Sequence, residues 1–110
     1  MPVRLIVMYV ICFFVPVTHV EDVILAVFLT GAGKVGNYDC CSWQSLGNGQ
    51  FRPLSGSDPF IGSVGGIEVL KEYKVEMVCA DEFIQDAINA LRKTHPYEEP
   101  AFQVTRLEFF

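Results

Sequence analysis

The chain opens with a stretch that is apolar on both of its strand faces. Residues 5–15 are rich in β-branched and aromatic side chains, a composition typical of a buried strand, and we expect that strand over about residues 4–15. Successive strand residues point to opposite sides, so one side carries Leu5, Val7, Tyr9, Ile11 and Phe13 and the other Ile6, Met8, Val10, Cys12 and Phe14. Because helices cover only one side of a sheet, the other side requires a further partner.

A first helix is predicted directly after Pro16. Thr18 and Glu21 have the spacing of a capping box, and Gly31 and Gly33 follow at the position where glycine ends helices. The apolar face of this helix comprises Val20, Val23, Ile24, Val27 and Phe28.

A second helix is predicted between residues 81 and 95. Asp81 is its expected N-cap, Arg92 and Lys93 lie in its last turn, and Pro96 ends it. Its apolar face comprises Phe83, Ile84, Ala87, Ile88 and Leu91.

The remaining segments read as strands and turns. We expect residues 37–45 to be extended and to turn at Leu46–Gly49 into residues 50–54 as a β-hairpin, followed by an ordered loop at 55–66. Residues 68–80 alternate as a long strand, and a last strand covers about 101–108. The order predicts an α+β ferredoxin-like βαββαβ sandwich with an extra hairpin, in which an antiparallel sheet carries two helices on one face. Residues 1–110 would form a single domain.

Composition narrows the class of partner. Eight basic and thirteen acidic residues give a formal net charge of −5 in 110 residues, and no basic run occurs. That charge argues against nucleic acid and against anionic membrane surfaces as partners. A mean hydropathy of +0.33 in a 12.3 kDa chain indicates more apolar surface than one copy can bury. We therefore expect a homo-oligomer.

The redox state and the location follow from the cysteines and the N-terminal run. Cys12, Cys40, Cys41 and Cys79 lack zinc-site spacing, and reduced thiols in a cytoplasmic protein are the simplest interpretation. A cleaved signal peptide over residues 1–20 is the alternative to a first strand. Its single Arg4 and the lack of a small-residue cleavage site argue against it.

The segment from His95 to Pro100 is dense in polar residues. His95 with Glu98 or Glu99, and with Cys41 as a further ligand, could bind a divalent metal ion. The alternative is a connection between elements in which His95 is hydrogen-bonded. The glycines of residues 31–36 follow a helix instead of leading into one, so they indicate a cap and a turn, not a phosphate site.

A second group of polar residues surrounds the expected hairpin. Arg52 could hold a small anion or carboxylate, or form a salt bridge across an interface. The candidate ligand-binding residues are Asn37, Tyr38, Arg52, Asp58, His95 and Tyr97. With two histidines and no distinctive nucleophile arrangement, catalytic chemistry has little support, and we expect no catalytic residues.

Five motifs in order carry a family resemblance: residues 31–38, 41–43, 49–53, 56–62 and 95–101. They resemble the inserted domain of the long bacterial Nif-three-like proteins of the YqfO type. That resemblance implies a fold similar to the PII signalling and CutA ion-tolerance proteins, and a homotrimer. The metal centre of the full-length proteins lies in flanking lobes, so their metal chemistry does not transfer.

Together, these observations predict a non-catalytic oligomeric module. It would bind a small ligand or ion at a cleft between subunits, in a regulatory or structural role. The alternative is a CutA-like protein that binds a divalent metal ion through His95 and Glu98 or Glu99.

Overall fold

The computed structural model describes residues 6–110 as one four-stranded sheet and two helices. The elements in chain order are β1 (Met8–Pro16), α1 (Val20–Phe28), β2 (Trp43–Phe51), β3 (Glu68–Ala80), α2 (Asp81–Thr94) and β4 (Phe102–Arg106). The long strand predicted at 68–80 has those bounds. The first strand is confirmed over Met8–Pro16, whereas its expected start at Arg4 and Leu5 lies outside the described residues.

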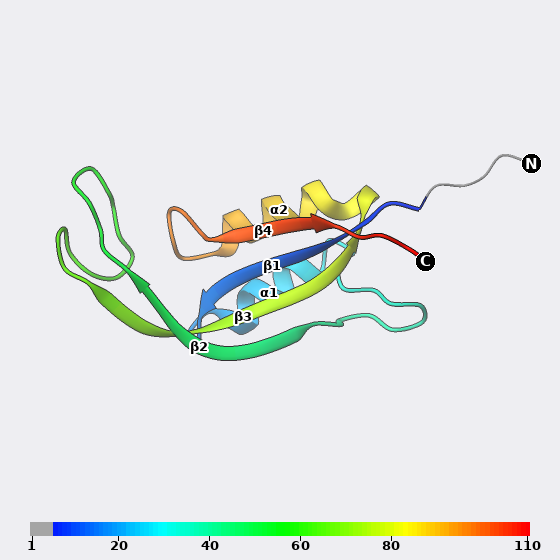
Figure 1. Cartoon of the computed structure of the whole chain (residues 1–110), viewed down its shortest axis with the longest axis horizontal. Coiled ribbons are helices and arrows are strands. Elements are labelled where there is room, and N and C mark those ends of the chain that lie inside the picture. The colour runs from blue at the N-terminus through cyan, green and yellow to red at the C-terminus, as the bar shows by residue number, and fades with distance from the viewer. Residues whose placement is uncertain (1–5) are drawn as a thin grey trace, which may run out of the picture.

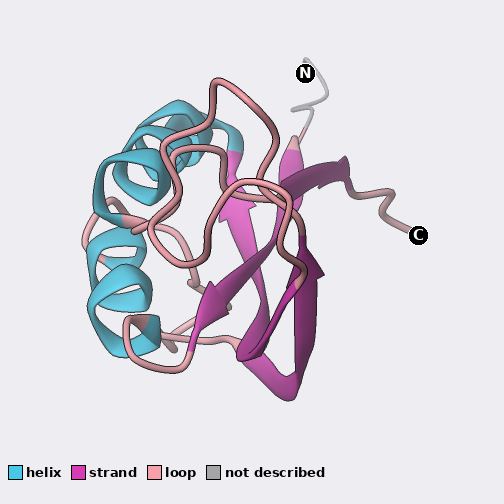
Figure 2. Ribbon diagram, turned by 90° about the vertical axis from the view of Figure 1, so that its left-hand side faces the viewer, coloured by secondary structure: helices cyan, strands magenta, loops and turns pink. Residues whose placement is uncertain are grey.

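The sheet has the order β2-β3-β1-β4, and all of its pairings are antiparallel. The helices form a second layer on one face of this sheet, while the opposite face carries no helix (Figures 1 and 2). The predicted α+β ferredoxin-like sandwich is thus confirmed. No helix in residues 6–110 combines the length and apolar character needed to cross a membrane.

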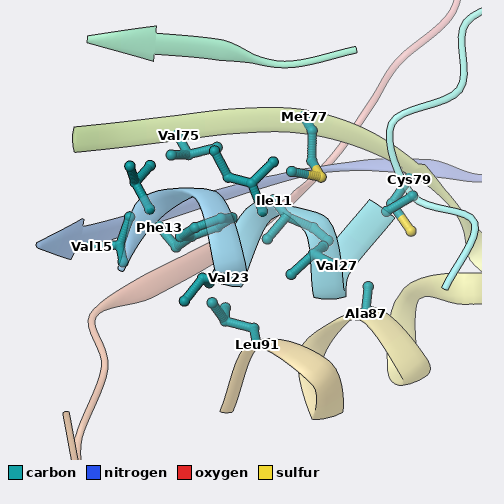
Figure 3. Close-up of a cluster of buried hydrophobic side chains, with 13 residues drawn as sticks. Ile11, Phe13, Val15, Val23, Val27, Val75, Met77, Cys79, Ala87 and Leu91 are labelled. Atoms are coloured by element: carbon teal, nitrogen blue, oxygen red, sulfur yellow. The ribbon is translucent and has the colours of Figure 1, made fainter. Parts of the chain in front are cut away.

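The core lies between the sheet and the two helices (Figure 3). Side chains at alternate positions of β1 and β3 point toward the helices, and those that are most buried belong to Ile11, Phe13, Val15, Val75, Met77 and Cys79. They meet the buried faces of the helices, represented by Val23, Val27, Ala87 and Leu91. The 3.6-residue periodicity seen in the sequence therefore marks the surfaces that pack against the sheet.

The second face of β1 is only half-buried, as its composition predicts. Val10, Cys12 and Phe14 alternate with the core residues and lie on the face without helices. Each is flanked across the strands on the same side, Val10 for example by Val78 and Thr105. At the β2 edge, Trp43 leaves 70% of its side chain exposed. We call this surface the open face.

The expected hairpin at Leu46–Gly49 is wrong. Residues 43–51 form one uninterrupted strand that pairs with β3 from Trp43–Glu76 to Phe51–Glu68. The glycines suggested a turn, but continuous pairing with residues 68–76 of β3 satisfies more backbone groups than a local turn would. The reversal occurs in the loop at 52–67, which contains the segment predicted as an ordered loop.

Two predicted helix caps are also wrong. The α1 helix begins at Val20 without a side-chain cap, and the Thr18 hydroxyl lies 2.7 Å from His19 Nδ1 instead. Asp81 is the first residue of α2, and its carboxylate accepts a hydrogen bond from the Tyr9 hydroxyl at 3.1 Å. That bond raises the pKa of Tyr9. The carboxylate still favours the helix because it lies at the positive end of the helix dipole.

Candidate functional site

Two connections meet where β1 ends. One is the loop at 52–67 between β2 and β3, and the other is the segment at 95–101 between α2 and β4 (Figure 1). The backbone N–H of Asp58 donates a hydrogen bond to Glu98 Oε2 at 3.0 Å and joins the two. Within the loop, the Ser57 hydroxyl donates to the Leu54 carbonyl at 2.7 Å. The Asp58–Glu98 bond thus joins segments that are 40 residues apart in sequence.

A cavity of about 340 Å³ lies between the two connections. We call it the loop pocket. Its lining is mostly apolar, and the residues that form it are Phe51, Arg52, Pro53, Leu54, Ser57, Pro59, Phe60, Tyr97, Glu98 and Glu99. A volume near the lower end of the range for ligand sites suits a small molecule.

Tyr97 is the central side chain of an aromatic wall in this pocket. Its ring centroid lies 5.8 Å from that of Phe51 and 6.4 Å from that of Phe60, with tilted geometry in both pairs. His19 extends the wall from outside the pocket through an edge contact to Phe60 at 5.2 Å. Such spacings are those of favourable aromatic pairs.

His95 contacts Tyr97 on the side of the core. The His95 side chain is 6% exposed, and its Nε2 lies 2.7 Å from the Phe14 carbonyl oxygen. Its Nδ1 accepts the backbone N–H of Tyr97 at 3.1 Å. These partners require a proton on Nε2 and none on Nδ1, which is the neutral tautomer. Burial lowers the pKa of His95 and favours the same form.

Glu72 holds the other end of Tyr97. The Tyr97 hydroxyl donates to Glu72 Oε2 at 2.8 Å, and the Glu72 residue is 9% exposed. Burial, and then this bond, raise the pKa of Tyr97, so its hydroxyl stays protonated at neutral pH. On β2, a Cβ at Gly49 would meet the Glu72 carboxylate directly. Gly49 therefore provides the space that the carboxylate occupies.

Charged groups at the pocket have few partners within the protein. Arg52 and Glu99 are exposed and line the cavity. Across residues 6–110 the salt bridge is that of Lys74 with Glu76 at 3.1 Å, so Arg52, Glu98 and Glu99 form none. The salt-bridge alternative for Arg52 is therefore not realised within one copy.

The structure brings together part of the predicted ligand site. Arg52 and Tyr97 line the loop pocket, His95 lies below it, and Asp58 contributes its backbone N–H. Asn37 and Tyr38 lie in the connection between α1 and β2, at the other end of the molecule (Figure 1). Tyr38 is 75% exposed there. Within a single copy these two residues do not share the pocket.

Sequence reasoning missed three residues of this region: Phe51, Phe60 and Glu72. The two phenylalanines read as ordinary apolar residues of a strand and a loop. Glu72 lay among the alternating charges of a long strand, and nothing in that pattern indicates that one of them is buried. The closest signal was the glycine at position 49 inside what proved to be a strand, since strand glycines often mark a close approach.

The predicted metal ligands are only partly available. Both ring nitrogens of His95 have backbone partners, so a metal ion there would have to displace one of them. Cys41 lies at the other end of β2, where its thiol is 3.5 Å from the Asp39 carbonyl. Within the described range no three His, Cys, Asp or Glu side chains are grouped as metal ligands. Metal binding at His95, Glu98 and Glu99 stays a prediction.

Comparison with known proteins places this chain beside one segment of longer proteins. No family model matches the chain. Over 94 residues it is 45% identical to a Mycobacterium leprae protein named GTP cyclohydrolase 1 type 2 homolog, which covers 86% of this chain and 24% of that protein. The structure of a Bacillus cereus protein related to NIF3 superposes with a TM-score of 0.83 at 35% identity, over 99% of this chain and 28% of that one. The chain thus spans about a quarter of the length of these relatives.

The fold is also similar to that of proteins outside this group of relatives. The CutA divalent cation tolerance protein of Archaeoglobus fulgidus superposes with a TM-score of 0.66 over 94% of this chain and 86% of its own, at 14% identity. At that identity the match concerns the fold alone. The resemblance to the PII/CutA-like inserted domain of the Nif-three-like proteins is confirmed by the two sets of matches together.

Replacing Gly49 by Ala should displace Glu72 and break its hydrogen bond with Tyr97. We expect the free energy of unfolding to fall by about 1–3 kcal/mol, measured by urea denaturation. Gly47→Ala is the matched control on the same strand, because a Cβ there meets nothing within 4 Å. The free energy of unfolding of Gly47→Ala should stay within about 1 kcal/mol of that of the parent protein. Equal effects of the two substitutions would contradict the role assigned to Gly49.

Stability should also depend on pH through His95. Because the folded pKa of His95 lies below its ordinary value of 6.5, the unfolded chain takes up this proton first as the pH falls. The contribution of His95 to the free energy of unfolding is therefore complete above about pH 6.5. It is lost as the pH falls below that value, and the free energy then changes by at most about 1.4 kcal/mol per pH unit. His95→Gln should flatten the dependence of the urea midpoint on pH below about pH 6.5. An unflattened curve for His95→Gln would refute the assignment.

Proposed function

We propose that this chain, as a relative of one segment of the NIF3-related proteins, is a non-catalytic binding module. It assembles with copies of itself and holds a small ligand in the loop pocket. Its role is to sense or position that ligand, not to transform it. Binding of the ligand would reinforce the contact between the loop at 52–67 and the segment at 95–101, in regulation or in structural support.

The observation that carries the proposal is the loop pocket itself. It combines mostly apolar walls with Arg52, Glu98 and Glu99, none of which has a salt-bridge partner in residues 6–110. Apolar walls with a few convergent polar groups are characteristic of small-molecule sites. The hydrogen bonds of Tyr97 to His95 and Glu72 fix its ring within the chain itself, which reduces the entropy cost of binding.

The state of the titratable groups supports a role without catalysis. A general acid or base needs a free proton position near neutral pKa. Both nitrogens of His95 are used by the backbone, and the pKa of Tyr97 is raised. The name GTP cyclohydrolase 1 type 2 homolog belongs to relatives about four times as long, and we propose that this chain alone does not carry such an activity.

The open face supports self-association. Val10, Cys12 and Phe14 cross its centre without a helix above them, and Trp43 is exposed at its edge. Apolar side chains at the centre of a face, here flanked across the strands by Lys74, Glu76 and Gln103, are typical of an interface between proteins. The resemblance to PII and CutA proteins favours a homotrimer. All four cysteines are free, which agrees with the cytoplasmic location that we propose.

The pocket can be tested with the fluorescent probe 1-anilinonaphthalene-8-sulfonate. This aromatic anion should gain fluorescence in the apolar cavity, with its sulfonate at Arg52. Ser57→Trp places a large side chain in the lining and should abolish the gain, whereas Ser63→Trp, in the same loop but outside the lining, should keep it. An undiminished signal from Ser57→Trp would place the probe elsewhere and contradict the proposal.

Self-association can be tested by light scattering. The parent chain should have a mass of about three times 12.3 kDa in solution. Val10→Glu puts a charge in the middle of the open face and should give a folded monomer, because burying an unpaired carboxylate is costly. Leu29→Glu, on an exposed position after α1, should keep the parent mass. A monomeric parent chain would refute the assembly.

A further inference from the structure

We infer that the loop pocket takes a small zwitterion with an apolar body, a molecule of the amino-acid class that carries one ammonium and one carboxylate group. The ammonium would lie near the aromatic wall with Glu98 and Glu99, and the carboxylate would lie on Arg52. The inference rests on the proposed function and names the chemical class of its ligand.

The aromatic wall favours a cation. Faces of aromatic rings attract ammonium groups, and the attraction grows where water is excluded. Tyr97, at the centre of the wall, donates its hydroxyl proton toward the Glu72 carboxylate at 2.8 Å. A phenol that donates to an anion becomes richer in ring electrons, so this contact strengthens the attraction of the ring for positive charge. The Glu72 carboxylate lies at the hydroxyl end of this ring.

The two carboxylates at the pocket favour the same charge. Glu98 has one oxygen, Oε2, bonded to the Asp58 N–H, and its other oxygen has no hydrogen-bond partner in residues 6–110. Glu99 has no side-chain hydrogen bond within that range. Both line the cavity, so an ammonium there would acquire charge-assisted bonds that the protein itself does not supply.

Arg52 requires the opposite charge on the same ligand. Its guanidinium is exposed, lines the cavity and forms no salt bridge within residues 6–110. The planar fork of an arginine suits a carboxylate, which it can bind through two parallel hydrogen bonds. A ligand with an ammonium alone would leave Arg52 unpaired, and a ligand with a carboxylate alone would leave Glu99 unpaired.

Other ligand classes fit less well. The lining contains two carboxylates against one cation, and it includes no lysine and no helix N-terminus, so a multiply charged phosphate would be repelled. A neutral apolar molecule would remove water from three charged groups without replacing its hydrogen bonds. A zwitterion satisfies both signs of charge.

Three probes with the same phenyl body separate these classes. They are L-phenylalanine, 2-phenylethylamine and 3-phenylpropanoate, which carry both charges, the positive charge alone and the negative charge alone. Their affinities are measured by displacement of 1-anilinonaphthalene-8-sulfonate from the parent protein. L-phenylalanine should displace the probe at a concentration about three- to tenfold lower than either analogue does.

Two substitutions assign each charge to its residue. Glu99→Gln should remove the advantage of L-phenylalanine over 3-phenylpropanoate, and Arg52→Gln should remove its advantage over 2-phenylethylamine. Because Arg52→Gln also weakens the fluorescent probe, affinities for that variant are confirmed by calorimetry. Glu108→Gln and Arg106→Gln are matched controls at exposed positions outside the pocket, and they should keep both advantages.

The outcomes distinguish this inference from the proposed function. If 3-phenylpropanoate binds as tightly as L-phenylalanine, or if none of the three displaces a bound fluorescent probe, the zwitterion class is refuted while the pocket remains a binding site. If the fluorescent probe does not bind in the pocket at all, the proposed function fails and the inference fails with it.

Discussion

The position of β1 in the middle of the sheet is the constraint on which the rest of the molecule depends. This strand pairs with β3 on one side and with β4 on the other, so its backbone groups are satisfied within the sheet. Its side chains are apolar on both sides. One set forms the core beneath α1 and α2, and the other set, at Val10, Cys12 and Phe14, lies on the open face. The same strand therefore stabilises the single chain and forms the centre of the open face, through which we propose that copies assemble.

The end of β1 also organises the candidate site. Beyond Pro16 the sheet narrows to β2 and β3, and both ends of the segment at 95–101 are hydrogen-bonded to Phe14 near the end of β1. His95 attaches this segment to the Phe14 carbonyl, and Tyr97 continues it to Glu72 on β3. The pocket is thus attached to the two central strands of the sheet through two hydrogen-bonded side chains, although the loop at 52–67 forms much of its wall.

This chain is similar to a segment that makes up about a quarter of the length of the NIF3-related proteins. The matched segment contains the whole sheet, both helices and both pocket connections. The resemblance to CutA concerns the backbone arrangement at 14% identity. Function therefore has to be argued from the side chains of this chain, because a shared fold carries many activities.

The sequence by itself determined the layers of the fold. Periodicity of 3.6 in two segments and of 2 in residues 68–80 was enough to predict two helices on one antiparallel sheet, since burial of one face imposes that pattern. It also identified Arg52, His95 and Tyr97 as unusual residues. Only the tertiary structure decided that Gly47 and Gly49 lie inside a strand. Pairing with β3 involves residues remote in sequence, and the local preference of glycine for turns carries no information about it. It also decided that Glu72 is buried against Gly49, and that Asn37 and Tyr38 lie far from the pocket. All of these features depend on contacts between residues that are remote in sequence, and such contacts form only when the chain folds.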